Sequence, residues 1–380
     1  MIYFDNAATT FPKPSEVYDF MDKFNRNSAL NLNRGNYDNL SSAENITSKT
    51  RHMLLDLFNC NANYKVVFTP SATISINIVL QGLSYKNIKN VYITPFEHNA
   101  VLRPLYYLQK KYNFDIITLK MSHTGFVYDI ESIQTQFNTK KPDILVMSHA
   151  SNAFGIICPI EKIISLAKKF RCTTILDCAQ TAGLLDIDMY SNSIDYLIFA
   201  GHKTLYAPFG VSGIVMKDNS VLSPLYYGGT GILSQEKDMP NFLPERLEAG
   251  SLNTLSIAGL YASLKWIKKI TTKKIRDTES KLKSELMDCL NQFSNIRLIG
   301  DNNAVGIISC TFENYSPDEI GKILKEKQIA VRTGLHCSPL AHQVMGTFPL
   351  GTVRFSLSYF STIEEIKELE SALIYIYNNS

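Results

Sequence analysis

Residues 173–203 read TTILDCAQTAGLLDIDMYSNSIDYLIFAGHK, with a short apolar run at each end. The first run, Thr173–Asp177, ends in an aspartate, and the second, Tyr196–Ala200, leads into His202 and Lys203. Uninterrupted runs of this length are typical of strands that are buried on both faces of a parallel sheet. Ligands of such sheets bind at the carboxyl ends of the strands, so the polar residues that follow the two runs are candidates for a functional site.

Five further apolar runs flank this stretch: Lys65–Thr69, Val91–Thr94, Ile116–Leu119, Ile144–Ser148 and Val211–Met216. Amphipathic segments with helical spacing lie between several of them: Ile74–Leu83, Asn99–Tyr112 and Ile160–Phe170. Strands that alternate with helices indicate an α/β fold. We expect a mainly parallel seven-stranded sheet sandwiched by helices.

The pattern of apolar and polar residues changes after about residue 217. Residues 228–254 are rich in Gly, Pro, Asn and Ser and predict an irregular segment, and Leu255 to about Phe293 predicts one long helix or two. The remainder predicts a smaller α+β unit, with strands at 296–299, 306–312, 329–332 and 352–357 and helices near 317–327 and 362–377. We therefore expect a large domain over 15–255 and a small C-terminal domain over 256–380, joined by the N-terminal segment 1–14.

Composition excludes several classes of protein. The chain has 380 residues, of which 45% are hydrophobic, so it can form a core without disulfide bonds. Its net charge of +3 gives no indication of a nucleic-acid or membrane partner. The seven cysteines show no CxxC spacing, so we expect neither a disulfide framework nor a metal site. With no targeting segment and no apolar run of membrane-spanning length, the sequence predicts a cytoplasmic protein.

Several motifs at strand ends have a common chemistry. A partly buried lysine such as Lys203 has a lowered pKa and suits Schiff-base formation. An aspartate at the end of a buried strand, as at Asp177, needs a partner such as a protonated pyridine nitrogen, and Gln180 could donate to a ring oxygen. Ser71, Ala72 and Thr73 open a predicted helix, whose N-terminus could hold a phosphate.

Two further residues complete the pattern. His98 follows the strand at 91–94 and could stack on a flat ring, and Asn152 follows the strand at 144–148 and could bind a ring hydroxyl. Each motif alone is explained at least as well by helix capping, core packing or a solvated lysine. Together they indicate pyridoxal 5′-phosphate (PLP), whereas the absence of a GxGxxG fingerprint disfavours a dinucleotide.

Seven motifs in order along the chain carry a resemblance to a known family: DNAATT (5–10), EHNA (97–100), HASNAFG (149–155), DCAQ (177–180), FAGHK (199–203), EAGSLNT (248–254) and RTGLHC (332–337). The chain resembles the cysteine desulfurases and selenocysteine lyases, which are class V aminotransferase relatives with the type I fold of PLP-dependent transferases. RTGLHC is similar to the RxGxHC motif of the group II desulfurases.

The resemblance implies a role for each matching residue. Lys203 would bind PLP covalently, and Cys337 and His98 would join it as catalytic residues. The other cofactor contacts would come from Ala72, Thr73, Asn152, Asp177, Gln180, His202 and Ser251. Because Ser251 would reach the phosphate of the partner subunit, a homodimer is implied. Arg354 would clamp the substrate carboxylate, and Asn33 and Arg34 would line the substrate entrance.

The implied reaction converts L-cysteine to L-alanine and leaves a persulfide on Cys337 for a sulfur-acceptor protein. Positive charge on Arg332 and His336 would favour the thiolate of Cys337. Three positions depart from the family pattern: Ser71 replaces a frequent glycine, Asn33 a frequent histidine and Ala200 a frequent Ser or Thr. Selenocysteine lyase, another PLP-dependent lyase or aminotransferase, and a non-catalytic scaffold remain alternatives.

Overall fold

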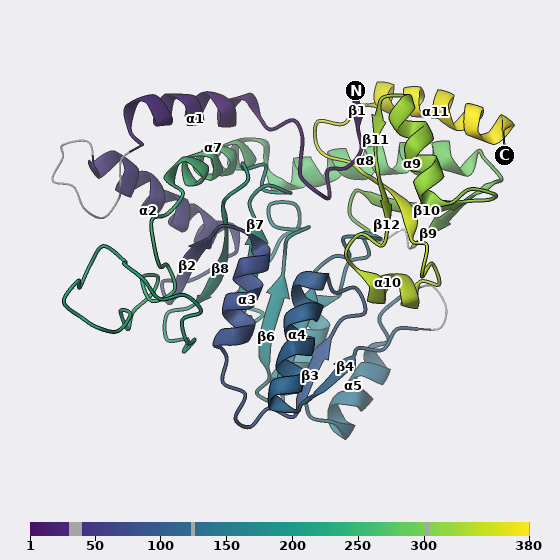
Figure 1. Cartoon of the computed structure of the whole chain (residues 1–380). Coiled ribbons are helices and arrows are strands. Elements are labelled where there is room, and N and C mark those ends of the chain that lie inside the picture. Colours follow the sequence, from purple (N-terminus) through teal and green to yellow (C-terminus); the bar gives the residue numbers. More distant parts are fainter. Residues whose placement is uncertain (30–39, 123–125, 301–303, 380) are drawn as a thin grey trace.

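A seven-stranded sheet forms the centre of the larger part of the molecule (Figure 1). The computed structural model describes residues 1–29, 40–122, 126–300 and 304–379. The strand order is β2-β8-β7-β6-β5-β3-β4, and every strand is parallel to the others except β8, which runs antiparallel to both of its neighbours. The predicted α/β class and the seven predicted strands are confirmed: β2 (Tyr64–Thr69), β3 (Asn90–Ile93), β4 (Asp115–Thr118), β5 (Ile144–Ser148), β6 (Thr173–Asp177), β7 (Tyr196–Ala200) and β8 (Ser212–Lys217).

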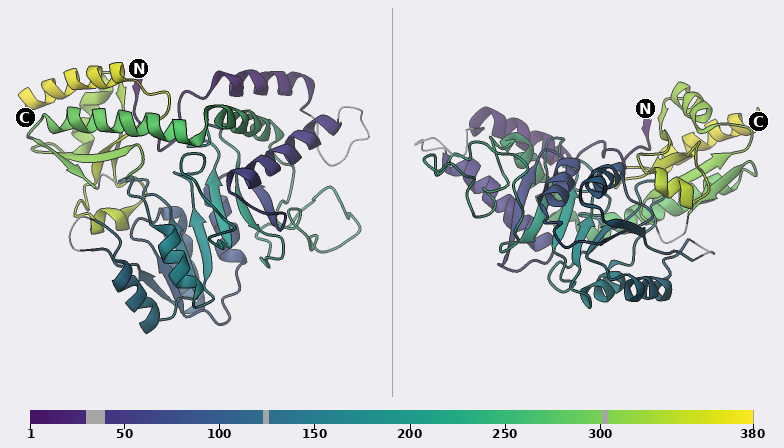
Figure 2. Two further views of the ribbon diagram at one scale, coloured as in Figure 1. Left: turned by 180° about the vertical axis from the view of Figure 1, so that it is seen from behind. Right: turned by 60° about the horizontal axis from the view of Figure 1, so that its bottom comes forward.

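Helices cover both faces of this sheet (Figures 1 and 2). On one face α3 (Ala72–Gly82) and α4 (Asn99–Tyr112) pack on one set of alternating strand residues. On the other face α5 (Ile130–Thr139) and α6 (Ile160–Lys168) pack on the alternate set. Successive strand residues point to opposite faces, so a sheet with two covered faces needs the continuous apolar runs that the sequence contains.

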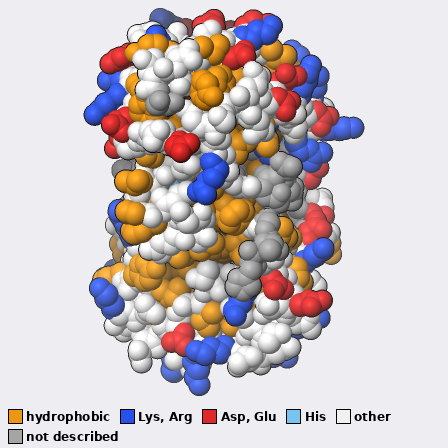
Figure 3. Space-filling view, turned by 90° about the vertical axis from the view of Figure 1, so that its right-hand side faces the viewer, with side chains coloured by type: hydrophobic (Ala, Val, Ile, Leu, Met, Phe, Trp, Pro, Cys, Tyr) orange, Lys and Arg blue, Asp and Glu red, His pale blue; other side chains and the backbone are white. Residues whose placement is uncertain are grey.

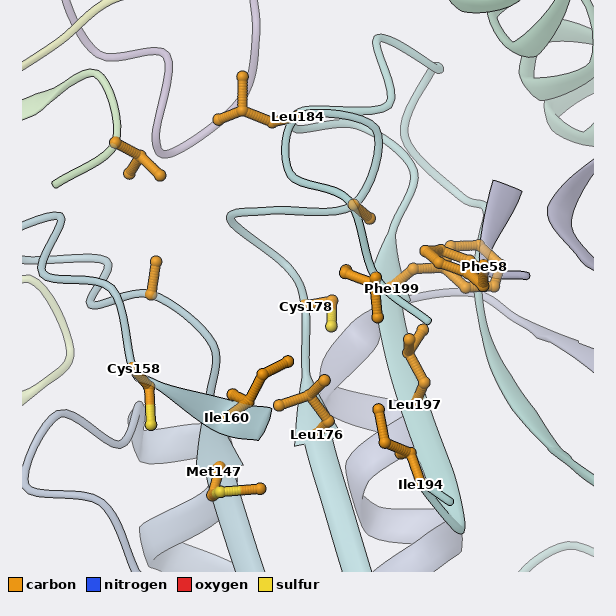
Figure 4. Close-up of a cluster of buried hydrophobic side chains, with 14 of the residues drawn as sticks. Phe58, Met147, Cys158, Ile160, Leu176, Cys178, Leu184, Ile194, Leu197 and Phe199 are labelled. Carbon is orange, nitrogen blue, oxygen red and sulfur yellow. The ribbon is translucent and has the colours of Figure 1, made fainter. Parts of the chain in front are cut away.

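The second of these cores is the larger and is drawn in Figure 4. Leu176 on β6 and Leu197 on β7 lie side by side, and Phe199 lies against Phe58 with 6.3 Å between the ring centroids. Leu176, Leu197, Phe199 and Phe58 are all fully buried. This core fixes β6 and β7 next to each other, which in turn fixes the distance between the segments that follow them.

The smaller part contains a four-stranded antiparallel sheet in the order β12-β13-β10-β9. Its strands are β9 (Ile296–Ile299), β10 (Ile307–Phe312), β12 (Arg332–Gly334) and β13 (Thr352–Ser356). The N-terminal strand β1 (Ile2–Tyr3) lies here too, paired with β11 (Ile329–Ala330), and Figure 1 shows the N-terminus beside α11. The helices of this part are α8 (Thr272–Asn291), α9 (Pro317–Glu326), α10 (Pro339–Val344) and α11 (Ile363–Asn378).

The segment predicted as one long helix or two consists of α7 (Thr254–Ile270) and α8, which meet at Thr271, where φ is 77°. Helix α7 packs against α1 (Ser15–Asn27) and α2 (Leu40–Leu57), whereas α8 packs in the core of the smaller part. The division at residue 256 stays a prediction. Because packing changes partners between α7 and α8, we propose that the boundary lies near Thr271.

The face of the molecule that includes the smaller part has a mixed surface. Figure 3 shows that charged side chains gather toward the upper and lower ends of this face, while hydrophobic side chains are exposed across its middle. Within the ranges that the structure describes, none of the helices is both long and apolar enough to cross a lipid bilayer.

A buried ion pair anchors the irregular segment 228–253, which contains no helix or strand, as predicted. Both terminal nitrogens of the Arg51 guanidinium donate to Glu248, at 2.9 and 2.8 Å. Glu248 also accepts from the backbone N–H of Phe68 at 2.6 Å, and the guanidinium lies over the Phe68 ring. The pair therefore ties this segment to α2 and to β2.

We expect Arg51→Met to lower the free energy of unfolding by about 3–5 kcal/mol, because it leaves the Glu248 carboxylate buried without its cation. Urea unfolding followed by circular dichroism measures the change. The control is Arg26→Met, which removes an exposed pair with Asp22 and should leave the unfolding midpoint unchanged. Equal stability of Arg51→Met and the unaltered protein would contradict the anchoring role.

Candidate active site

One cavity collects most of the predicted cofactor residues. It opens at the edge of the large sheet where β3, β5, β6 and β7 end and α3 begins. Eight predicted residues line it: Ala72, Thr73, His98, Asn152, Asp177, Gln180, His202 and Lys203. Because parallel strands end at the same edge, segments more than 100 residues apart along the chain meet there.

Lys203 enters this cavity through a tight turn after β7. The N–H of Gly201 donates to the carbonyl of Val211 at 3.1 Å, and a Cβ at Gly201 would lie 2.4 Å from that same oxygen. Only glycine allows this approach. Burial lowers the pKa of Lys203 to about 8, an effect that Asp177 opposes and Arg354 reinforces. A larger fraction of this amine is therefore neutral near pH 7 than in an ordinary lysine.

The N-terminal segment holds the backbone of this turn. The Thr10 hydroxyl donates to the carbonyl of Lys203 at 2.9 Å, and the Thr9 hydroxyl donates to the carbonyl of His202 at 3.0 Å. The Lys13 ammonium also donates to the carbonyl of His202, at 2.9 Å. The sequence analysis missed this role, although Thr9 and Thr10 belong to the DNAATT motif that carried the resemblance.

Asp177 ends β6 and is buried beside the cavity. Burial raises the pKa of its carboxyl, while the N–H of Ala179 donates to Oδ1 at 2.9 Å and limits the shift. A carboxyl in this position gains from a cationic ring nitrogen as a partner. Gln180, one turn further on, donates its Nε2 to the carbonyl of Ala7 at 3.0 Å and still lines the cavity.

Two neutral histidines flank Lys203. The Nδ1 atom of His98 accepts from the N–H of Ala100 at 3.0 Å and caps α4, and burial together with the charge of Lys203 lowers the pKa of His98 to about 4. His202 stacks on Phe209 with 4.6 Å between centroids, and burial lowers its pKa to about 3. Its Nδ1 atom is buried and has no hydrogen-bond partner in the described part of the chain.

The start of α3 offers a site for an anion. Ser71 caps the helix by accepting from the N–H of Ile74 at 3.3 Å, and Ala72 and Thr73 present the first turn to the cavity. A helix N-terminus carries a partial positive charge and free amide hydrogens. The φ of Ser71, −158°, is ordinary extended backbone, so a serine fits where the family often has glycine.

Cys337 is half-buried on the loop between β12 and α10, close enough to Lys203 for their charges to interact. A nitrogen of Arg332 lies 3.7 Å from its sulfur, as the prediction for Arg332 requires. The prediction for His336 is wrong: its Nε2 contacts the Thr352 hydroxyl at 3.0 Å, and burial lowers its pKa to about 2, so the ring carries no charge. Sequence neighbourhood did not reveal that this ring is buried against Thr352 and His342.

Arg354 is buried on β13 and is already engaged. Its guanidinium donates to Oδ1 of Asp5 at 2.6 Å and to the carbonyl of Asn152 at 2.8 Å. Its Nε atom is buried without a partner among the described residues. The predicted role in clamping a substrate carboxylate stays a prediction, and Asp5 is a charged partner that the sequence analysis did not identify.

Ser251, a predicted cofactor residue, does not line this cavity. Ser251 is exposed and lines a second cavity, together with Thr69, Tyr226 and Glu248. Asn33 and Arg34 lie outside the described residues.

Comparisons with known proteins agree with this geometry. The family profile of class-V aminotransferases matches residues 2–369. A cysteine desulfurase of Synechococcus elongatus is 30% identical, over all of this chain and 61% of that protein, so the chain spans less than two thirds of this relative. A probable cysteine desulfurase of Methanothermobacter thermautotrophicus is 29% identical over 98% of this chain and 94% of its own length.

Solved structures show the same fold. A cysteine desulfurase from Thermococcus onnurineus superposes with a TM-score of 0.91 at 25% identity, covering 100% of this chain and 95% of that one. The cysteine desulfurase CsdA of Escherichia coli superposes with a TM-score of 0.86 at 23% identity, covering 98% and 94%. The match over nearly the whole chain and the eight residues gathered in one cavity lead to one conclusion: the chain belongs to the class-V aminotransferase family.

Proposed function

We propose that this chain is a PLP-dependent cysteine desulfurase, which converts L-cysteine to L-alanine and keeps the sulfur as a persulfide on Cys337. One observation carries the proposal. Asn152 lines the cavity that contains Lys203 and also binds the loop of Cys337, donating to the carbonyl of His336 at 2.7 Å. This contact supports the proposal that Lys203 and the half-buried thiol of Cys337 serve one site. The desulfurase relatives support the same activity.

The residues of the cavity fit PLP. Lys203 supplies an amine of lowered pKa for the aldehyde, and Asp177 a buried carboxyl for the pyridine nitrogen. The neutral ring of His98 offers a flat face, while the N-terminus of α3 and the unpartnered Nδ1 of His202 suit the phosphate. When bound, PLP supplies an electron sink for negative charge that develops at the substrate Cα.

The chain's own residues perform the remaining tasks. Lys203 would hold the cofactor, and its free amine would accept the proton from the substrate Cα. Asp177 holds a proton on the pyridine nitrogen. Arg354, whose Nε is free, and Arg332, next to Cys337, supply positive charge for the substrate carboxylate and for the sulfur.

The sulfur step needs no external oxidant. The Cys337 sulfur attacks the sulfur of the substrate, so an S–S bond forms and the substrate's C–S bond breaks. The electron pair of the broken bond goes to the substrate carbon, which is then protonated. The products are alanine and the Cys337 persulfide, and the atoms of one cysteine and one enzyme thiol are all accounted for.

The proposal includes three features of the assembly. Two chains form a homodimer, in which the exposed Ser251 reaches the phosphate of the partner's cofactor. A sulfur-acceptor protein docks near Cys337, where Val344 at the end of α10 and Phe348 and Leu350 after it expose apolar side chains. The enzyme works in the reducing cytoplasm, which is consistent with seven free cysteines.

We expect covalent capture of added PLP by the cofactor-free protein to accelerate with pH up to about 8 and to level off above it. Lys203 attacks only as the neutral amine, and burial lowers its pKa to about 8. Stopped-flow visible absorbance from about pH 6 to about pH 10 measures the rate. The control is Lys203→Ala, in which slow capture at surface lysines continues to rise through about pH 10. A rate in the unaltered protein that still climbs steeply above about pH 9 would contradict a lowered pKa of Lys203.

We expect L-cysteine to add one sulfur to the peptide that contains Cys337, as measured by mass spectrometry. Cys337→Ala should lower sulfide release in the presence of a reductant by about two orders of magnitude, because the nucleophile is lost. Its visible spectral response to L-cysteine should persist. Cys60→Ala is the matched control, since Cys60 is also half-buried and burial raises its pKa to about 12.

Full sulfide release by Cys337→Ala would contradict the persulfide step and favour a lyase in which Cys337 is not the nucleophile. Turnover of L-selenocysteine without turnover of L-cysteine would identify a selenocysteine lyase.

A further inference from the structure

We propose that Asn152 is a positioning residue for Cys337, and that it aligns the thiol with the cofactor cavity. The inference rests on the proposed function. The side chain of Asn152 is buried, and both ends of its amide are used by the residues on either side of Cys337. Its Nδ2 donates to the carbonyl of His336 at 2.7 Å, and its Oδ1 accepts from the Ser338 hydroxyl at 2.6 Å.

The backbone of this loop explains why such a clamp is needed. Both His336 and Cys337 have positive φ values, 49° and 60°. Two successive non-glycine residues in the left-handed region persist only when surrounding contacts hold them. Besides the amide of Asn152, the loop is held by the N–H of Asn99, which donates to the carbonyl of Cys337 at 2.8 Å.

The backbone of Asn152 is also held in place. Its carbonyl accepts from Arg354 at 2.8 Å, and Arg354 is paired with Asp5 at 2.6 Å. The chain of contacts therefore runs from the N-terminal segment through β13 to the loop of Cys337. Asn152 also lines the cofactor cavity, so one side chain fixes the position of the thiol relative to the cavity.

The hydrogen bonds that Asn152 makes on either side of Cys337 affect the accessibility and the reactivity of the thiol in opposite ways. A loop released from Asn152 exposes the half-buried thiol to solvent, so a small alkylating reagent reaches it faster. The same release moves the sulfur away from its attack position, so transfer from bound L-cysteine slows. A variant that retains its cofactor but is only less stable should not combine faster alkylation of Cys337 with slower persulfide formation.

The test uses Ser338→Ala in the PLP-loaded protein. Ser338 does not line the cavity, so the visible spectrum and the KM for L-cysteine should be unchanged. Loss of one hydrogen bond should lower the single-turnover rate of persulfide formation about 2- to 10-fold. Alkylation of Cys337 by iodoacetamide without L-cysteine, followed by peptide mass spectrometry, should accelerate by a similar factor. The matched control is Ser263→Ala, a buried serine on α7 whose hydroxyl donates to Leu260, and both rates should stay unchanged.

A double-mutant cycle provides the second arm. Asn152→Ala removes both clamp bonds and should accelerate alkylation more than Ser338→Ala does. The double variant should react no faster than Asn152→Ala, because the two residues share one interaction.

The inference is overturned if Ser338→Ala matches Ser263→Ala in both rates, if alkylation and persulfide formation change in the same direction, or if the effects of Ser338→Ala and Asn152→Ala on alkylation are additive. Failure of the proposed function looks different. In that case the unaltered protein forms no persulfide, while the alkylation measurements still report whether Asn152 holds the loop.

Discussion

The parallel pairing of β3, β5, β6 and β7 is the constraint on which the rest of the molecule depends. It brings the ends of these strands to one edge of the sheet, and the side chains that line the cavity follow directly: His98 after β3, Asn152 after β5, Asp177 at the end of β6 and Lys203 after β7. Burial of the strands on both faces holds their spacing, since the two cores pack against alternate residues of the same strands. The sheet therefore fixes the spacing of the residues that line the cavity.

Burial at this edge also sets the chemistry. The charged forms of Lys203 and Asp177 are both disfavoured by loss of water, so the pKa of the lysine falls and that of the aspartate rises. Such groups are prepared for a partner that brings its own polar and charged atoms. The histidines respond in the same way and stay neutral, which leaves their rings available for stacking and hydrogen bonding.

The N-terminal segment links the two parts of the molecule. Its first strand pairs with β11 of the smaller part, and Asp5 pairs with Arg354 on β13. A few residues later, Thr9, Thr10 and Lys13 bind the backbone of His202 and Lys203 in the larger part. Residues 2–13 thus connect the turn that carries Lys203 to the smaller part, whose strand β12 leads into the loop of Cys337. This arrangement is consistent with the proposed site, in which the thiol of one part and the amine of the other act together.

The sequence by itself determined the seven central strands, the irregular segment and eight residues of the cavity, because the period of apolar residues and the polar residues at strand ends are local signals. It left open whether residues 255–293 form one helix or two, and it misjudged His336, whose charge depends on burial in a core assembled from distant segments. Only the tertiary structure decided that Arg354 pairs with Asp5, that Ser251 lies apart from the cavity, and that Asn152 grips the loop of Cys337. These contacts join residues that are up to 349 positions apart, and no local pattern encodes which side chains meet once the two parts pack together.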